Sequence, residues 1–185
     1  AIPDPGSAVF IVVDGQGKCS KKCATTTQAQ KGAVNTSFNA VWPLSDGSFL
    51  VAGESQTGAN FGALDAVIFR IDQNGTLDAL NIFGGSGDDR FWQIRPGANG
   101  GAVAVGSKSG KAWLVGADAA GKLVWQSMLG TAKDAQDLRA APFGWVVATW
   151  TAGAQSLFGT DPVGNVLWQR TFLGAPYTLL STPKG

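Results

Sequence analysis

The chain has 185 residues, of which 44% are hydrophobic, 15% are charged and 26 are glycine. A hydrophobic share of this size excludes a wholly disordered chain, and the length suits a single domain. The absence of histidine excludes Ser-His-Asp and Cys-His catalysis and histidine-ligated metal sites, and a net charge of +1 provides no strong field for nucleic acid.

The composition predicts an all-β protein without a membrane span. Many glycines accompany many valines, phenylalanines and tryptophans, which is typical of short strands joined by tight turns. The longest strongly apolar stretch, residues 8–13, is far shorter than the roughly 20 residues that a membrane helix requires.

The first predicted strand, residues 8–13, leads into an Asp-x-x-Gly pattern that returns after three later apolar strands. An aspartate at the first turn position accepts a hydrogen bond from the backbone N–H two residues on, and the glycine at the fourth position adopts positive φ. The pattern therefore predicts four hairpins. We interpret the carboxylates as turn-forming rather than metal-binding or catalytic. They belong to Asp14, Asp72, Asp118 and Asp161.

A long insertion, residues 19–37, follows the first turn and contains the only two cysteines, Cys19 and Cys23. Two thiols without histidine do not close a tetrahedral zinc site, and their spacing is not the C-x-x-C of redox proteins. We favour a local disulfide, which indicates an oxidising location at the cell surface or outside the cell. Two reduced cysteines, or a bridge to another chain, are the alternatives.

Two Asn-x-Ser/Thr sequences are candidate glycosylation sites, at Asn35 and at Asn74. Both asparagines lie on predicted loops. We expect both to be accessible for glycosylation in an organism that glycosylates its secreted proteins.

A second hairpin follows each of the first three turns. Its strands are residues 38–44 and 49–53, then 91–96 and 102–106, then 138–142 and 145–149. Two hairpins give four short antiparallel strands in roughly 45 residues, which is the period of a β-propeller blade. We therefore predict a small single-domain β-propeller of four blades. The repeats are residues 8–58, 64–110, 111–153 and 154–185.

The last predicted blade is incomplete. After the strand that ends at residue 172, only residues 177–180 have the character of a strand. The fourth blade therefore has an open edge, and an unpaired edge is a site at which a partner adds a strand.

The regular spacing of certain residues also predicts their roles. Trp113, Trp125 and Trp168 fall at repeated positions, so we expect them to pack between blades. Asp88 and Asp89 are the only adjacent carboxylates. Because successive strand side chains point to opposite faces, we expect these two not to converge as an acid–base pair. We interpret both as turn or capping residues.

Three stretches carry a family resemblance. They are Trp113-Leu114-Val115 with Asp118, Gly121 and Trp125, residues 84–89, and residues 46–53. These stretches are similar to the tandem repeats of bacterial and archaeal surface proteins built from β-propeller blades, and more distantly to quinoprotein-like propellers. The resemblance spans nearly the whole chain and implies a secreted protein with a propeller fold, but it does not indicate a particular function.

The first functional hypothesis is a secreted, non-enzymatic structural or interaction module, such as a subunit of an extracellular filament or surface assembly. It depends on the low charge, the absence of histidine, the expected disulfide and the open last blade. The expected partner is the chain itself, joined by strand donation in which residues 1–8 are one candidate donor. We expect no cofactor and no nucleic-acid or membrane partner.

Two hypotheses from other classes remain. A carbohydrate-binding propeller would use exposed tryptophan, asparagine and aspartate side chains on the loops. A lyase or hydrolase would need carboxylates that converge around a central channel, and no spacing in the sequence indicates such convergence.

Overall fold

The structure is a computed structural model that describes residues 7–10, 25–28, 35–56, 62–74, 76–151, 153–173 and 179. Within these residues every regular element is a β-strand, apart from one short 3-10 turn at Ala98–Gly100. The prediction of an all-β chain is therefore confirmed.

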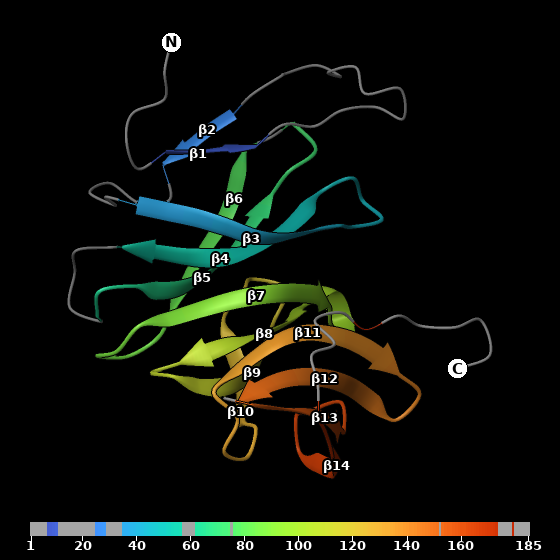
Figure 1. Cartoon of the computed structure of the whole chain (residues 1–185). Coiled ribbons are helices and arrows are strands. Elements are labelled where there is room, and N and C mark those ends of the chain that lie inside the picture. The colour runs from blue at the N-terminus through green and yellow to red at the C-terminus, as the bar shows by residue number, and fades with distance from the viewer. Residues whose placement is uncertain are drawn as a thin grey trace.

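The strands form three four-stranded antiparallel sheets, each in simple chain order, and one separate pair (Figure 1). The first sheet consists of β3 (Asn35–Pro43), β4 (Phe49–Gln56), β5 (Asp65–Ile71) and β6 (Leu77–Phe83). The second consists of β7 (Asp89–Pro96), β8 (Ala102–Lys108), β9 (Lys111–Ala117) and β10 (Leu123–Met128). The third consists of β11 (Asp134–Ala141), β12 (Gly144–Thr151), β13 (Ala154–Thr160) and β14 (Val166–Phe172). The separate pair is β1 (Ser7–Phe10) with β2 (Thr25–Gln28).

The hairpins group differently from the predicted repeats. Each sheet joins the second hairpin of one predicted repeat to the Asp-x-x-Gly hairpin of the next, because the two middle strands pair along their whole length, as β4 and β5 do. β4 and β5 are almost entirely buried, which suits the centre of a sheet covered on both faces. The sheets cover residues 35–83, 89–128 and 134–172, one hairpin out of phase with the repeats.

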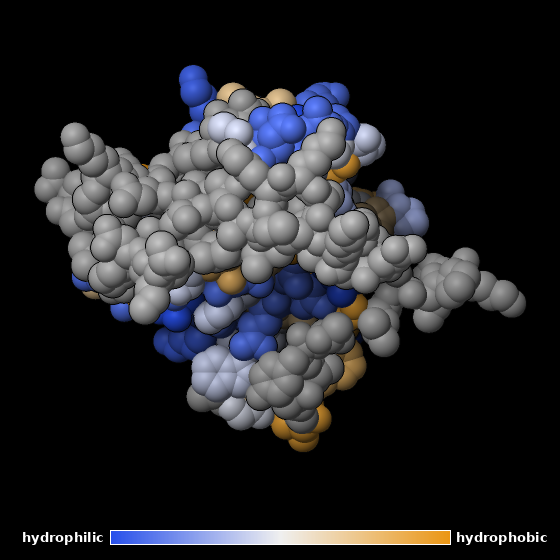
Figure 2. Space-filling model, turned by 90° about the horizontal axis from the view of Figure 1, so that it is seen from above, coloured by the Kyte–Doolittle hydropathy of each residue, from blue (hydrophilic) through white to orange (hydrophobic). Residues whose placement is uncertain are grey.

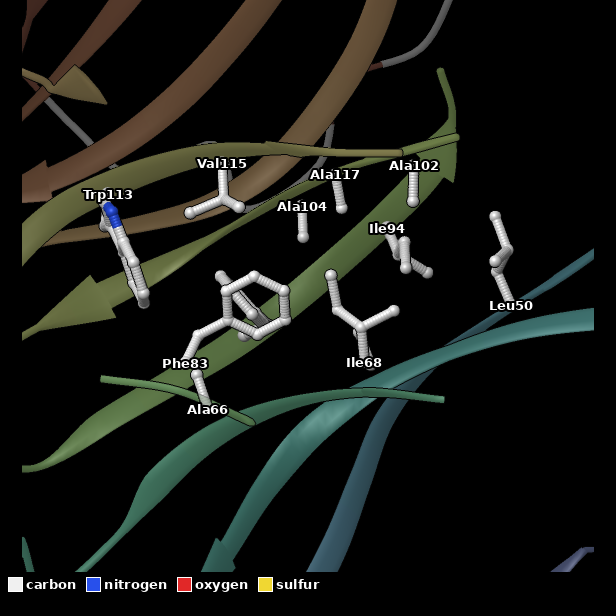
Figure 3. Close-up of a cluster of buried hydrophobic side chains, with 12 residues drawn as sticks. Leu50, Ala66, Ile68, Phe83, Ile94, Ala102, Ala104, Trp113, Val115 and Ala117 are labelled. Atoms are coloured by element: carbon white, nitrogen blue, oxygen red, sulfur yellow. The ribbon is translucent and has the colours of Figure 1, made fainter. Parts of the chain in front are cut away.

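Two hydrophobic layers hold the three sheets face to face. In the first layer, Ile68 of the first sheet lies opposite Ile94 and Ala104 of the second sheet (Figure 3). In the second layer, Val105 of the second sheet packs with Phe158 of the third. Because neighbouring residues of a strand point to opposite faces, Ala104 and Val105 contribute to different layers and bury both faces of the middle sheet.

The first strand of each sheet packs on the preceding sheet, β7 on β3 to β5 and β11 on β7 to β9, and we call β3, β7 and β11 the inner strands. Each inner strand carries a bulge at the same place, at Asn39, Trp92 and Gln136. Opposite the first two bulges stand Gly53 and Gly106, where an added Cβ would lie 1.9 Å from a backbone carbonyl oxygen. Glycine at these two positions therefore permits a close backbone approach beside the bulge.

Two segments differ from the predictions near the ends of the chain. Residues 19–37, predicted as one inserted loop, include β2 and the start of β3, which begins at Asn35. The third sheet has all four of its strands. Of the strand predicted at residues 177–180, only Leu179 is described, and it contacts the inner strand β11.

Candidate functional site

Three of the four aspartates of the predicted hairpins are described, and they lie in tight turns between the third and fourth strands of the sheets. Oδ1 of Asp72, Asp118 and Asp161 each accepts two backbone N–H groups at 2.7–3.0 Å. At Asp161, the Asn165 side-chain amide adds a hydrogen bond of 2.7 Å and holds the pKa of the carboxyl below its ordinary value. These carboxylates are used within their own turns.

The other predicted site residues are in different situations. Asp14, Cys19 and Cys23 lie outside the described residues. Asn74 is exposed in the turn between β5 and β6. Asn35 is the first residue of β3 and pairs with β4, so the prediction that it lies on a loop is wrong.

The three regularly spaced tryptophans pack in two ways. Trp113 is 1% exposed in the first hydrophobic layer, which confirms the prediction for this residue. Trp125 and Trp168 are half-buried, and each ring lies over a glycine on the neighbouring strand, Gly116 and Gly159 respectively. The Trp125 ring also packs against the second hydrophobic layer and the Gly164 turn of the third sheet, so it lies between two sheets as well as across the strands of its own.

The adjacent carboxylates Asp88 and Asp89 diverge, as strand geometry predicts. Asp89 is fully buried, and its two oxygens accept the backbone N–H groups of Gly85 at 2.6 Å and of Ser109 at 2.8 Å. Asp89 thereby caps the loop before β7 and the turn after β8. Asp88 is exposed and faces a separate pocket.

We call this hollow the polar pocket; it has a volume of about 430 Å³ and lies where β7 and β11 begin. The Arg90 guanidinium in its wall is 3.3 Å from the Glu54 carboxylate and 5.5 Å from the centre of the Trp92 ring. The polar pocket can therefore offer carboxylates, hydroxyls and one guanidinium to a ligand. Its lining residues are Asp88, Arg90, Ser107, Ser109, Gly110 and Asp134.

The pKa of Asp134, in the wall of the polar pocket, is raised from its ordinary value. Burial raises the pKa of its carboxyl, against the opposing effects of the Trp92 indole N–H, which donates a hydrogen bond of 2.7 Å, and of nearby Arg90. Desolvation disfavours the charged form of a carboxyl more than these partners favour it. Asp134 therefore accepts a proton more readily than an exposed aspartate.

Replacing Asp134 with asparagine should change how stability depends on pH. Because the pKa in the folded state lies above the ordinary 3.8, the folded chain binds more protons, and stability falls as pH rises through that pKa. Asparagine keeps an acceptor for Trp92 without ionising. We expect Asp134→Asn to gain unfolding free energy relative to the unaltered chain between about pH 4 and pH 7, measured by urea denaturation. A pH-independent difference, or one that shrinks with rising pH, would contradict this assignment.

A chain of contacts that the sequence analysis missed connects the inner strands. The Arg95 guanidinium of β7 lies 4.4 Å from the centre of the Trp42 ring on β3 and 3.7 Å from the Asp137 carboxylate on β11. Asp137 also accepts a hydrogen bond of 2.9 Å from Arg139 and one of 2.6 Å from the backbone N–H of Leu179. The available sequence signal was a charged side chain within a strand, Arg95 in β7 and Asp137 in β11.

The outer strands carry most of the exposed large hydrophobic side chains. β10 and β14 are the last strands of the second and third sheets, and no described strand pairs with their outer sides. A Cβ on Gly164 would lie 2.5 Å from the Trp125 ring, so the turn before β14 touches β10. We call this surface the apolar rim. Its residues are Leu123, Val124, Met128, Val163, Val166, Leu167, Phe172 and Leu173.

A cleft of about 490 Å³ between the second and third sheets adjoins the apolar rim. Val124, Trp125, Pro162 and Val163 are in its wall, so it is mainly apolar. Figure 2 shows a different face, seen from above. On it, hydrophilic side chains gather near the middle, and small hydrophobic patches lie at the edges.

No group of three or more aspartate, glutamate or cysteine residues could hold a metal ion in the part of the chain described. Nor does any helix there combine the length and apolar character needed to cross a membrane.

Comparison with known proteins gives a likeness in fold. No family model and no curated protein matches the chain. A solved structure of a protein of unknown function from Bacteroides caccae matches with a TM-score of 0.54 at 15% sequence identity, over 90% of this chain and 54% of that one. The chain therefore spans about half the length of this structural neighbour, and an identity this low relates the two folds alone.

Proposed function

We propose that the chain is a non-enzymatic β-propeller module that acts outside the cell or at its surface and associates with further copies through its outer strands. Three successive four-stranded meanders support the propeller arrangement, because each places its first strand against the preceding sheet. The repeated bulge in the inner strands also supports it, since equivalent strands then bend in the same way.

The two end segments support a fourth blade. The β1–β2 pair contacts β3 of the first sheet and, like β5–β6, encloses an Asp-x-x-Gly pattern, so it corresponds to the outer half of a blade. Leu179 contacts β11 as β11 contacts β7, so it corresponds to an inner strand. These two segments would supply outer and inner parts of a fourth blade.

The observation that carries the proposed association is the chemistry of the outer strands. Soluble proteins usually protect an exposed edge strand with charged residues, proline or a covering segment. β10 has the sequence LVWQSM, with no charged residue, and β14 has the sequence VLWQRTF, with Arg170 alone. Val124 is 64% exposed and Leu167 54% exposed on these strands. An apolar, unprotected edge is suited to pairing with another β-strand.

A second copy of the chain is the partner that fits this edge. Every copy presents the same apolar strand, and two identical edges can pair antiparallel about a two-fold axis. Such pairing would bury the exposed side chains of both β14 strands, with Leu173, 95% exposed, at the end of the contact.

Lysine on the apolar rim should weaken this association. Leu167→Lys or Val124→Lys places a charge where a second strand would pack, and we expect at least about a tenfold weaker dimer, equivalent to about 1.4 kcal/mol. Sedimentation velocity over a concentration series measures it. Ser45→Lys adds the same charge to an exposed turn between β3 and β4 and is the control. A chain that stays monomeric at all concentrations, or variants that associate like the unaltered chain, would argue against the proposal.

Carbohydrate binding is the second candidate function, and the polar pocket is the observation that favours it. Asp88, Arg90 and the two serines, Ser107 and Ser109, provide both donors and acceptors for sugar hydroxyls. Binding to a glycan array, lost on Arg90→Met and kept on Arg170→Met, would support this function. Absence of binding across a broad array would exclude it.

A further inference from the structure

Leu179 is held from both sides of its peptide backbone. Its N–H donates to Oδ2 of Asp137 at 2.6 Å, and its carbonyl oxygen accepts from Nε of Arg139 at 2.9 Å. Asp137 and Arg139 stand two residues apart on the inner strand β11, so both contacts come from one face of that strand. We call these two side chains the backbone clasp.

The backbone clasp is arranged by contacts within the sheets. Asp137 is 2% exposed, and its Oδ1 accepts from the Leu138 backbone N–H at 2.8 Å and from Nη1 of Arg139 at 2.9 Å. Nη1 of Arg139 also donates to the Leu138 carbonyl oxygen at 3.0 Å. Oδ1 and Nη1 are thus engaged locally, and Oδ2 and Nε bind the incoming residue. Because the two side chains are already fixed, little side-chain entropy is lost when a backbone binds.

The backbone clasp lies on the side of β11 where a further inner strand would stand. The positions that correspond to Arg139 on the other inner strands, three residues after the bulge, are Trp42 and Arg95, and Arg95 packs over the Trp42 ring at 4.4 Å. On its other side, the Arg95 guanidinium lies 3.7 Å from the Asp137 carboxylate of the next inner strand. Leu179 continues this succession as the next inner strand would.

We propose that the backbone clasp is a receptor for an extended peptide backbone, which Leu179 fills within one chain and Leu179 of a second copy fills in an assembly. Recognition through N–H and carbonyl groups is independent of which copy supplies them. As in the proposed function, the partner is a second copy of the chain. The contact proposed here, however, is made by the inner strand β11 and not by the apolar rim.

The short connection to Leu179 favours exchange between copies. Five residues separate Leu173, just after the outer strand β14, from Leu179 beside the inner strand β11. The four strands of a sheet span about 14 Å, and six peptide steps reach at most about 20 Å. Short connections in general favour exchange of a terminal segment between copies, because exchange removes the geometric restriction of closing within one chain.

A peptide-binding experiment on the full chain tests the inference. A fluorescent synthetic peptide with the sequence of residues 174–185 is titrated with the unaltered chain, and anisotropy reports binding. We expect saturable binding, at least about tenfold weaker for a peptide N-methylated at the position of Leu179, because the charge-assisted bond to Asp137 is lost. Equal affinity of the two peptides, or no saturable binding up to millimolar concentrations, overturns the proposal.

Variants of the chain provide a second, independent comparison. Arg139→Met removes the Nε donor and should weaken peptide binding at least about tenfold, whereas Arg170→Met removes an exposed arginine of β14 and should not. If Arg139→Met binds the peptide as well as Arg170→Met does, the clasp is not the receptor. Leu167→Lys, which tests the apolar rim, should leave peptide binding unchanged, so failure of either proposal is recognised separately.

Discussion

Trp113→Ala should lower the free energy of unfolding by about 3–5 kcal/mol, the usual cost of removing a large aromatic side chain from a core. The Trp113 ring is 1% exposed and stacks on Phe91, with ring centres 5.1 Å apart. Its indole N–H donates to Gln126 at 3.1 Å, and the Lys108 ammonium lies 4.9 Å from the ring centre. Alanine would leave a cavity between the first and second sheets that neighbouring strands cannot fill.

Denaturant unfolding of matched variants measures this effect. Trp150→Ala is the control. Trp150 is 38% exposed on the third sheet, so this substitution makes the same chemical change at the surface. We expect the control to lose less than about 1 kcal/mol. Equal losses in the two variants would mean that the first hydrophobic layer does not hold the sheets together.

Asp137→Ala should cost about 3–5 kcal/mol of unfolding free energy, as when one member of a buried ion pair is removed. Arg95 is 9% exposed, and it would lose the carboxylate 3.7 Å away. Arg139 and the backbone N–H of Leu179 would lose acceptors as well. An unpaired charge in a buried position is costly, because no water replaces the missing partner.

Asp46→Ala is the control for this second variant. Asp46 pairs with Arg70 at 2.7 Å, but 53% of its side chain is exposed to solvent. Ion pairs at the surface contribute little, so the control should be far less destabilised than Asp137→Ala. The comparison is made by denaturant unfolding at neutral pH. Similar losses in both variants would contradict the importance of the contacts that join β7 to β11.

Local signals in the sequence predicted the parts of the fold that depend on a few consecutive residues. Asp72, Asp118 and Asp161 accept backbone hydrogen bonds within their own turns, so the Asp-x-x-Gly pattern contains the information that forms these bonds. The opposite directions of Asp88 and Asp89 likewise follow from strand alternation alone.

The grouping of hairpins into sheets could not be predicted in this way. Whether a strand pairs with the hairpin before it or after it depends on packing between residues far apart in the chain. The pairing of β4 with β5 decides the sheet boundary, and it depends on burying both strands between two layers. The sequence repeat has the same period whichever way the hairpins are grouped, so periodicity does not distinguish the predicted repeats from the observed sheets.

The candidate sites depend on the same long-range arrangement. The polar pocket combines Arg90 of β7 with Asp134 of β11, and Glu54 of β4 supports the arginine from another sheet. The backbone clasp combines two residues of β11 with Leu179, some 40 residues later in the chain. Such sites follow from the order and stacking of the sheets, which composition and spacing do not specify.

Amide hydrogen exchange in dilute and concentrated solution tests the proposed association at the apolar rim most directly. If copies pair through outer strands, the outward N–H groups of β14 gain hydrogen bonds, and their exchange should slow on association while the central strands β12 and β13 keep their rates. Association without slower exchange in β14 or β10 would mean that copies meet through another surface.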